Sequence, residues 1–156
     1  MGPLFRRRLS ARLFFSTALL ATLCLSEESS TAWRQSELIE PSALAKALDS
    51  SDPPYVVCVS DSAPYRTRHI AQAIFAGPGG KPEGIDLLKA AASVFSKDDN
   101  VVIYCGCCPL NKCPNVRPAY TALKESGFTH VRVLDVMTNL GSEWYGRGYP
   151  SESEEK

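Results

Sequence analysis

The amino-acid sequence predicts one α/β domain with a mainly parallel sheet flanked by helices. Short runs of four or five apolar residues alternate with segments of helical periodicity, which is typical of buried parallel strands and their connecting helices. The chain has 156 residues, of which 44% are hydrophobic, and shows no internal repeat. This length and composition suit a single globular core.

The first half of the domain is expected to begin with a helix over residues 41–48. Leu44, Ala47 and Leu48 share one face of that helix, and the polar, proline-containing segment 49–54 ends it. A buried strand is expected next, over residues 55–59, and a loop over 61–68. A partly extended segment over 69–75 and a glycine- and proline-rich turn over 77–82 should follow.

The second half is expected to contain a helix over 85–95, a strand over 101–104, a helix that starts after Asn115, a strand over 131–134 and a last short helix. Asn115 is a plausible N-cap, and Pro118 falls in the first turn, where its missing N–H costs nothing. Gly127 is the expected residue just past the end of this helix. Trp144, in the last helix, is expected in the core.

The two ends of the chain are expected to lie outside the domain. Four arginines precede a short apolar stretch at residues 13–25, which is the layout of a secretory signal peptide over 1–26. At about 13 residues the stretch is shorter than the roughly 20 needed to span a bilayer, so we expect no stable membrane anchor. We expect a disordered linker over 27–36, the domain over 37–150 and a disordered acidic tail over 151–156.

Charge and cysteine content limit the possible partners. Without residues 1–26 the chain keeps 13 of its 17 basic residues and all 17 acidic ones, a net charge of about −4, which argues against nucleic acid or anionic membrane. Five of six cysteines remain, because Cys24 is lost with the signal peptide. A periplasmic or secreted protein meets oxidising conditions, and an odd number leaves at least one thiol free, paired with another molecule or bound.

Four cysteines lie within nine residues between the 101–104 strand and the next helix: Cys105, Cys107, Cys108 and Cys113. The carboxyl end of a strand facing a helix N-terminus is where open α/β folds place catalytic groups, and a thiol there is favoured as thiolate. Cys105 ends the strand, and Gly106 lets backbone N–H groups turn inward to hold an anion. Lys112 and Arg117 are cations that could stabilise an anionic sulfur.

The sequence leaves three uses of these cysteines open. Cys105 and Cys108 have the Cys-x-x-Cys spacing of redox disulfides, and Cys113 could staple the loop by bonding to Cys107 or Cys108. All four could instead bind a soft metal such as Cu(I). Because exported thiols tend to oxidise before they meet metal, we expect no stoichiometric metal and no other cofactor. Cys58 is expected in the core or beside the loop, and His69 is expected to be structural.

Several strings, in their order and spacing, resemble a single rhodanese domain. They are Tyr65 before His69-Ile-x-x-Ala73, Val101-Val-Ile-Tyr-Cys105, the helix through Leu123-Lys-Glu-Ser-Gly-Phe128, the strand 131–134 and Trp144-Tyr-Gly-Arg-Gly-Tyr-Pro150. This resemblance implies a rhodanese-like fold, with Cys105 taking a sulfane sulfur as a persulfide and passing it to a thiophilic acceptor. Arg117 resembles the family's arginine at the end of the catalytic loop, although this loop is longer. Cys58-Val-Ser60 stands where the family has Asp-x-Arg.

We therefore expect an exported sulfurtransferase with Cys105 as nucleophile, aided by Arg117 and by backbone N–H groups of the loop. Its partners would be a small sulfur donor and a thiol acceptor, which could be a thiol-bearing protein. The alternatives are a thiol–disulfide redox protein using Cys105 and Cys108, and a non-catalytic module that binds a soft metal.

Overall fold

A computed structural model describes residues 32–154 of the chain. The expected signal peptide over 1–26 and the first part of the expected linker, 27–31, lie outside the described residues, as do residues 155 and 156. None of the helices between residues 32 and 154 has the length and hydropathy needed to span a bilayer.

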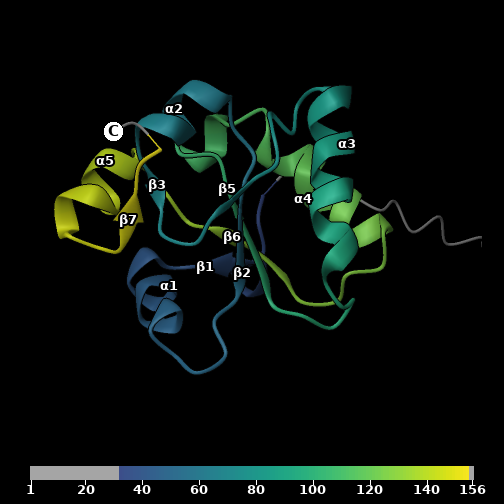
Figure 1. The fold of residues 1–156 in the computed structure, drawn as a ribbon, viewed down its shortest axis with the longest axis horizontal. Helices are drawn as coiled ribbons and strands as arrows, with labels where there is room; N and C mark the ends of the chain where they lie inside the picture. The colour runs from purple at the N-terminus through teal and green to yellow at the C-terminus, as the bar shows by residue number, and fades with distance from the viewer. Residues whose placement is uncertain (1–31, 155–156) are drawn as a thin grey trace, which may run out of the picture. The chain divides into compact units, whose positions relative to one another are not determined.

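The main sheet has five strands, all parallel, in the order β1, β6, β5, β2, β4 (Figure 1). The strands are β1 (Leu38–Ile39), β2 (Tyr55–Cys58), β4 (Ile74–Phe75), β5 (Val101–Tyr104) and β6 (Val131–Leu134). The sequence-based expectation of a mainly parallel sheet is confirmed. The central strand is β5, and Cys58 at the end of β2 lies opposite Tyr104 at its end.

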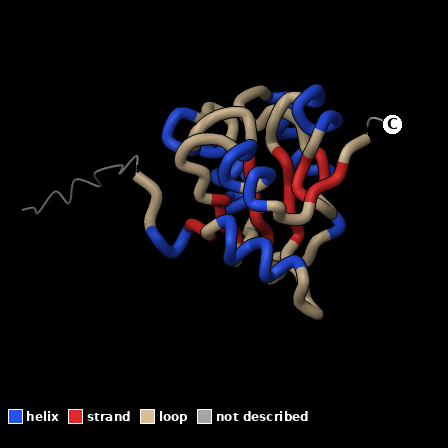
Figure 2. Tube along the Cα trace, turned by 90° about the vertical axis from the view of Figure 1, so that its left-hand side faces the viewer, coloured by secondary structure: helices blue, strands red, loops and turns tan. Residues whose placement is uncertain are grey.

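Helices cover both faces of the sheet (Figure 1), and in Figure 2 the strands lie between them. One face packs on α3 (Pro82–Ala91) and α4 (Val116–Glu125), and the other on α1 (Pro41–Leu48), α2 (Ser62–Thr67) and α5 (Leu140–Glu143). Successive strand residues point to opposite faces. Val57 and Ile103 therefore join the α3/α4 core, whereas Cys58 and Tyr104 join the other core.

The helices follow the predicted patterns closely. The buried face of α4 consists of the expected Val116, Ala119, Tyr120 and Leu123, together with Ala122. Gly127 follows α4 with φ +91°, a left-handed conformation that favours glycine and ends the helix as expected. Trp144 is fully buried between α5 and the 3-10 turn at Tyr145–Arg147, which confirms its predicted place in the core.

The segment over 61–68, expected to be a loop, contains α2. Its six residues, Ser-Ala-Pro-Tyr-Arg-Thr, are too few and too polar to show helical periodicity, so no pattern in the sequence indicates a helix. Tertiary packing explains it instead: Tyr65 is buried and its hydroxyl donates to the carbonyl oxygen of Ala73 at 2.7 Å.

Both expected disordered ends must be corrected where the structure describes them. Ser151–Glu152 forms β7, which pairs antiparallel with β3 (His69–Ile70) in a second, two-stranded sheet. Trp33 packs edge-on against Tyr120 with ring centroids 5.2 Å apart, just before a 3-10 turn at Gln35–Glu37. Both segments are polar in composition, and long-range pairing orders them in ways that local pattern does not reveal.

Candidate active site: a cysteine cluster at the end of the central strand

Cys105 directly follows the central strand β5 and is 4% exposed. Gly106 then turns the chain with φ +81°, and a Cβ at this position would lie 3.1 Å from Cδ2 of Leu140. The loop continues to Leu110, whose N–H donates to the carbonyl oxygen of Val136 at 2.8 Å. This bond ties the loop to the segment after β6, so the cysteine loop is anchored at both its strand end and its middle.

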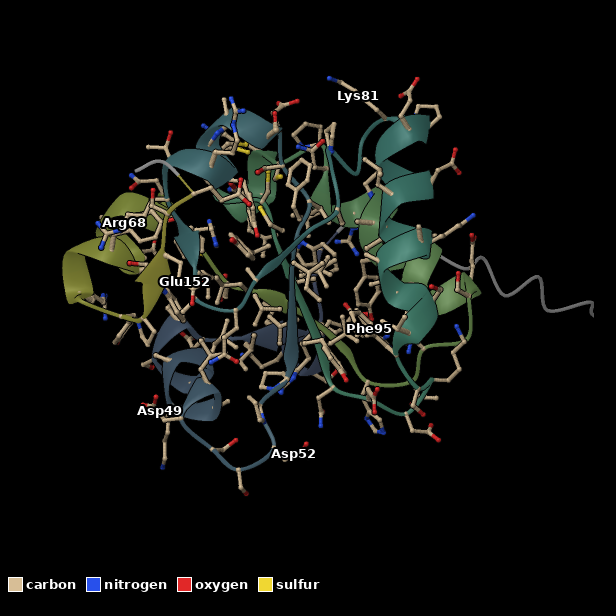
Figure 3. The ribbon with its side chains drawn as sticks, in the orientation of Figure 1. Asp49, Asp52, Arg68, Lys81, Phe95 and Glu152 are labelled. Atoms are coloured by element: carbon tan, nitrogen blue, oxygen red, sulfur yellow. The ribbon has the colours of Figure 1, made fainter. Side chains whose placement is uncertain are left out.

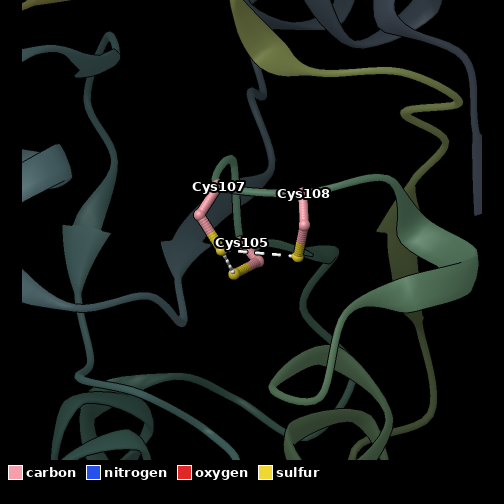
Figure 4. Close-up of side chains that lie close together, drawn as sticks. All are labelled: Cys105, Cys107 and Cys108. Atoms are coloured by element: carbon pink, nitrogen blue, oxygen red, sulfur yellow. Dashed lines mark hydrogen bonds between the residues drawn. The ribbon is translucent and has the colours of Figure 1, made fainter.

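Four groups of the loop donate hydrogen bonds to the Cys105 sulfur. Its Sγ lies 3.0 Å from the Sγ of Cys107 (Figure 4). Cys107 also offers its backbone N–H. The thiol of Cys113 and the side-chain amide of Asn115, with Nδ2 at 3.4 Å, approach the same sulfur. The backbone N–H of Cys107 thus joins these donors just after Gly106 turns the chain, and the anion-binding role of Gly106 stays a prediction.

These donors favour the thiolate form of Cys105. The hydrogen bond from Cys113, followed by those from Cys107 and Asn115, lowers the pKa of Cys105 to about 5, although burial opposes the shift. The pKa of Cys113 is raised because its proton is held by Cys105. The pKa of Cys107 is raised by burial and by the same kind of bond. At neutral pH Cys105 is therefore a thiolate that accepts hydrogen bonds from the protonated thiols of Cys107 and Cys113.

Asn115 has a different role from the one predicted. It occupies the N-cap position of α4, but its backbone is helical and its side chain makes no capping bond. Instead Nδ2 donates to Cys105 and Oδ1 accepts the N–H of Gly80 at 3.0 Å. A Cβ on Gly80 would lie 2.9 Å from Oδ1, so glycine allows this close approach. A short polar residue before a helix predicts a cap, and this alternative partner, 35 residues away, left no signal in the sequence.

A cavity of about 270 Å³ opens beside Cys105. Its lining includes Cys58, Arg68, Tyr104, Cys105, Gly106 and Tyr145. Arg68 is the cation among its lining residues, and its guanidinium carbon lies 4.4 Å from the centre of the Tyr145 ring. Its Nε donates to Oγ of Ser151, in β7, at 3.0 Å. Figure 3 shows Arg68 on the same side of the domain as Glu152 of β7. Arg68 was not predicted from the sequence, where nothing marks its contact with Ser151, 83 residues further along the chain.

The two cations proposed from the sequence lie elsewhere. The guanidinium carbon of Arg117 is 3.3 Å from the centre of the Trp33 ring, and Lys112 is exposed on the loop. Within residues 32–154, the lining of the cavity beside Cys105 includes neither of them. The role of Arg117 at the reacting sulfur therefore stays a prediction from the family resemblance, and that of Lys112 one from its charge.

The described cysteines are all free thiols, so neither predicted bond of Cys113, to Cys107 or Cys108, is present among residues 32–154. The sulfurs of Cys105, Cys107 and Cys108 lie within 4.8 Å of one another, and Cys107 and Cys108 are 3.4 Å apart. These three, with Cys113 beside Cys105, could serve as ligands of a soft metal. The expectation of no stoichiometric metal stays a prediction, which elemental analysis of the purified protein would test.

Two further residues singled out from the sequence are buried. Cys58 lies in the core and also lines the cavity, so both roles considered for it apply. Nδ1 of His69 is 2.7 Å from the carbonyl oxygen of Tyr65, and its ring stacks on Tyr65 with centroids 4.0 Å apart. These contacts fit the structural role expected for His69.

Comparison with known proteins shows similarity in structure. No family model and no curated protein matches the chain significantly. A crystal structure of the Alr3790 protein from Anabaena sp. matches with a TM-score of 0.59 and 23% identity, covering 76% of this chain and 94% of that one. The solution structure of the rhodanese-like domain of the same protein matches with a TM-score of 0.54 and 24% identity, covering 75% and 79%. The fold of this chain is rhodanese-like.

A third similar structure is a variant of EanB in complex with hercynine, with a TM-score of 0.53 and 18% identity. It covers 78% of this chain but only 29% of EanB. In this rhodanese-like fold, Cys105 directly follows the central parallel strand β5. The additional thiols belong to the loop between β5 and α4, which is where the sequence departs from the family pattern.

Proposed function

We propose that this rhodanese-like protein transfers sulfane sulfur through a persulfide on Cys105. The observation that supports the proposal most strongly is the hydrogen-bonded environment of Cys105. A buried sulfur that accepts bonds from two thiols, an amide and a backbone N–H, beside a cavity open to small molecules, has the properties of an activated nucleophile.

The reaction has two balanced steps. The Cys105 thiolate attacks the sulfane sulfur of a donor such as thiosulfate, the sulfur–sulfur bond of the donor breaks, and sulfite leaves with the bonding electron pair. An acceptor such as cyanide or a thiolate then attacks the terminal sulfur of the persulfide, and Cys105 leaves as a thiolate. The donors that stabilise the Cys105 thiolate also make it a good leaving group in the second step.

The cavity favours a small anionic sulfur donor. Aromatic and aliphatic side chains form much of its lining, and Arg68 provides a positive charge there. A guanidinium binds oxyanions such as the sulfonate oxygens of thiosulfate through a planar set of N–H groups. Arg68→Gln should therefore raise the KM for thiosulfate more than it lowers kcat.

We further propose that the mature protein is exported, periplasmic or secreted, after removal of residues 1–26. The arginine-flanked apolar stretch supports this location, and the net charge of about −4 that remains supports small-molecule or thiol partners rather than nucleic acid. Intact mass of the protein recovered outside the cytoplasm would test it. A full-length mass in that fraction, or recovery only from the cytoplasm, would contradict it.

The direct test of persulfide formation is site-resolved mass spectrometry after incubation with thiosulfate. We expect one equivalent of sulfite per chain and one added sulfur atom on the peptide that contains Cys105. In Cys105→Ser, both should be lost. Sulfite release without any added sulfur on Cys105 would contradict the proposal.

A second function, thiol–disulfide exchange, has one observation in its favour. The Sγ atoms of Cys105 and Cys107 are 3.0 Å apart, so the geometry favours a Cys105–Cys107 pair over the Cys105–Cys108 pair suggested by spacing. A redox protein would hold this disulfide with a potential of about −270 to −120 mV. Titration against glutathione buffers would measure it.

A further inference from the structure

Cys105 and Cys107 differ in access, although their sulfurs are 3.0 Å apart. Cys105 is 4% exposed and faces the cavity, whereas Cys107 is exposed. A cavity of about 270 Å³ lies at the lower end of small-molecule sites, so it admits a small donor. A cysteine on the surface of a folded protein cannot enter it without rearrangement. An acceptor of that size meets Cys107 first.

We propose that Cys107 relays the sulfane sulfur from Cys105 to an exposed thiol of an acceptor protein. The proposal rests on the function above and names the acceptor class for the same site. Small donors load Cys105 through the cavity, the sulfur moves across the contact between Cys105 and Cys107, and the acceptor collects it at the surface.

The transfer needs no proton or electron from outside Cys105 and Cys107. The Cys107 thiol first gives its proton to the terminal sulfur of the Cys105 persulfide. The resulting Cys107 thiolate attacks that terminal sulfur, the sulfur–sulfur bond to Cys105 breaks, and Cys105 leaves with the electron pair as a thiolate. The products are a protonated persulfide on Cys107 and the Cys105 thiolate. Oxidation states do not change overall, so no external oxidant or reductant is needed.

The environment of the pair favours this direction. Cys105 as a bare thiolate regains the hydrogen bonds from Cys113 and Asn115, which makes it the better leaving group. Burial and the hydrogen bonds with Cys105 and Cys108 raise the pKa of Cys107, so its thiolate is less stable than that of Cys105 and is the stronger nucleophile and the poorer leaving group of the two. The sulfane sulfur therefore moves from Cys105, which forms the more stable thiolate, to Cys107, which forms the less stable one.

Cys108 provides the matched control. It belongs to the same loop and its Sγ lies 3.4 Å from that of Cys107, but the hydrogen bonds described for the Cys105 sulfur come from other residues. The relay requires a thiol at 107 and not at 108. Serine at position 107 keeps a hydroxyl that can donate to Cys105 while removing the sulfur nucleophile, so Cys107→Ser tests the relay without removing the donor.

The experiment loads the full chain with thiosulfate under reducing conditions and measures two transfer rates. One acceptor is cyanide, which fits the cavity; the other is a folded carrier protein with a single surface cysteine. For Cys107→Ser, we expect the ratio of carrier transfer to cyanide transfer to fall by about tenfold or more. For Cys108→Ser, the ratio should stay within about twofold of the starting protein.

Each other outcome overturns the relay. An unchanged ratio in Cys107→Ser, or a lower ratio in Cys108→Ser alone, would place the exit elsewhere. A disulfide between Cys105 and Cys107 with release of sulfide would make Cys107 a resolving residue. Failure of the proposed function looks different: the Cys105 peptide of Cys107→Ser would then carry no added sulfur, and cyanide transfer would be absent from every variant.

Discussion

The ends of the neighbouring strands β2 and β5 each carry a buried cysteine, but the two are in opposite states. Cys58 is 2% exposed and Cys105 is 4% exposed, and both line the same cavity. Burial raises the pKa of Cys58, whereas hydrogen-bond donors lower the pKa of Cys105 to about 5. Hydrogen bonds from Ser60 and Tyr104 also act on Cys58, but burial is the larger effect there, so a buried thiol at a strand end becomes a thiolate only where its donors outweigh burial.

Strand alternation explains why the loop between β5 and α4 supplies donors to Cys105 and not to Cys58. Cys58 points to the face covered by α1 and Trp144, where its sulfur has the hydroxyl of Ser60 at 3.2 Å. Cys105 points to the opposite face, toward the start of α4, where Cys113 and Asn115 lie. The loop between β5 and α4 thus acts on one cysteine and leaves the other as an ordinary buried thiol.

The largest expected contrast is in catalysis. Cys105→Ser should reduce thiosulfate-to-cyanide sulfur transfer to background, about a thousandfold or more, because the serine hydroxyl is a far weaker nucleophile than a thiolate at neutral pH. Cys58→Ser should retain transfer within about threefold, since serine replaces a neutral thiol of similar size. Steady-state assays of both variants measure this contrast. Equal losses of transfer activity in the two variants would contradict the different states of Cys105 and Cys58.

The next contrast concerns the donors themselves. Cys113→Ala and Asn115→Ala each remove one hydrogen bond to a charged sulfur, worth about 1.5–3 kcal/mol, so each should raise the Cys105 pKa by about one to two pH units. The acid limb of the activity profile should move toward neutral pH by the same amount. Ser60→Ala, which removes the hydroxyl beside Cys58, should leave that limb in place. A shifted limb in Ser60→Ala, or an unshifted one in both donor variants, would count against this explanation.

Stability should depend on pH in opposite ways for the two cysteines. The Cys105 pKa is depressed in the folded state, so its stabilising contribution is present above the unfolded thiol pKa and is lost as pH falls toward 5. The Cys58 pKa is raised, so its contribution is present below the unfolded pKa and is lost as pH rises above it. Urea unfolding under reductant should show Cys105→Ser losing most at alkaline pH and Cys58→Ser losing least there.

The smallest effect is expected from the glycine that turns the loop. Gly106→Ala should cost about 1–2 kcal/mol, because its φ of +81° is left-handed and its Cβ would press on Leu140. Gly127→Ala is the control, with φ +91° and open space around the added methyl group. Both variants should lower the urea midpoint, but only Gly106→Ala should also slow sulfur transfer. Equal transfer rates in the two would mean that the loop adapts freely.

The sequence predicted the parts of this molecule that have local patterns. The apolar runs identified β2, β5 and β6, and helical periodicity identified α1, α3 and α4. The position of Cys105 at a strand end followed from the apolar run that predicted β5. The missed features are long-range contacts of polar segments: α2 held by Tyr65, β7 paired with β3, and Asn115 shared between Cys105 and Gly80. No spacing rule in the sequence identifies such partners.

The central claim, that the loop makes Cys105 a thiolate while Cys58 stays a thiol, is tested most directly by alkylation of both residues in one sample across a range of pH. The reduced protein is pulsed with a small alkylating reagent, and mass spectrometry follows the two peptides separately. We expect labelling of Cys105 to rise with a midpoint near pH 5, whereas labelling of Cys58 should rise only above the ordinary thiol pKa. A common midpoint for both cysteines, near the ordinary thiol value, would contradict it.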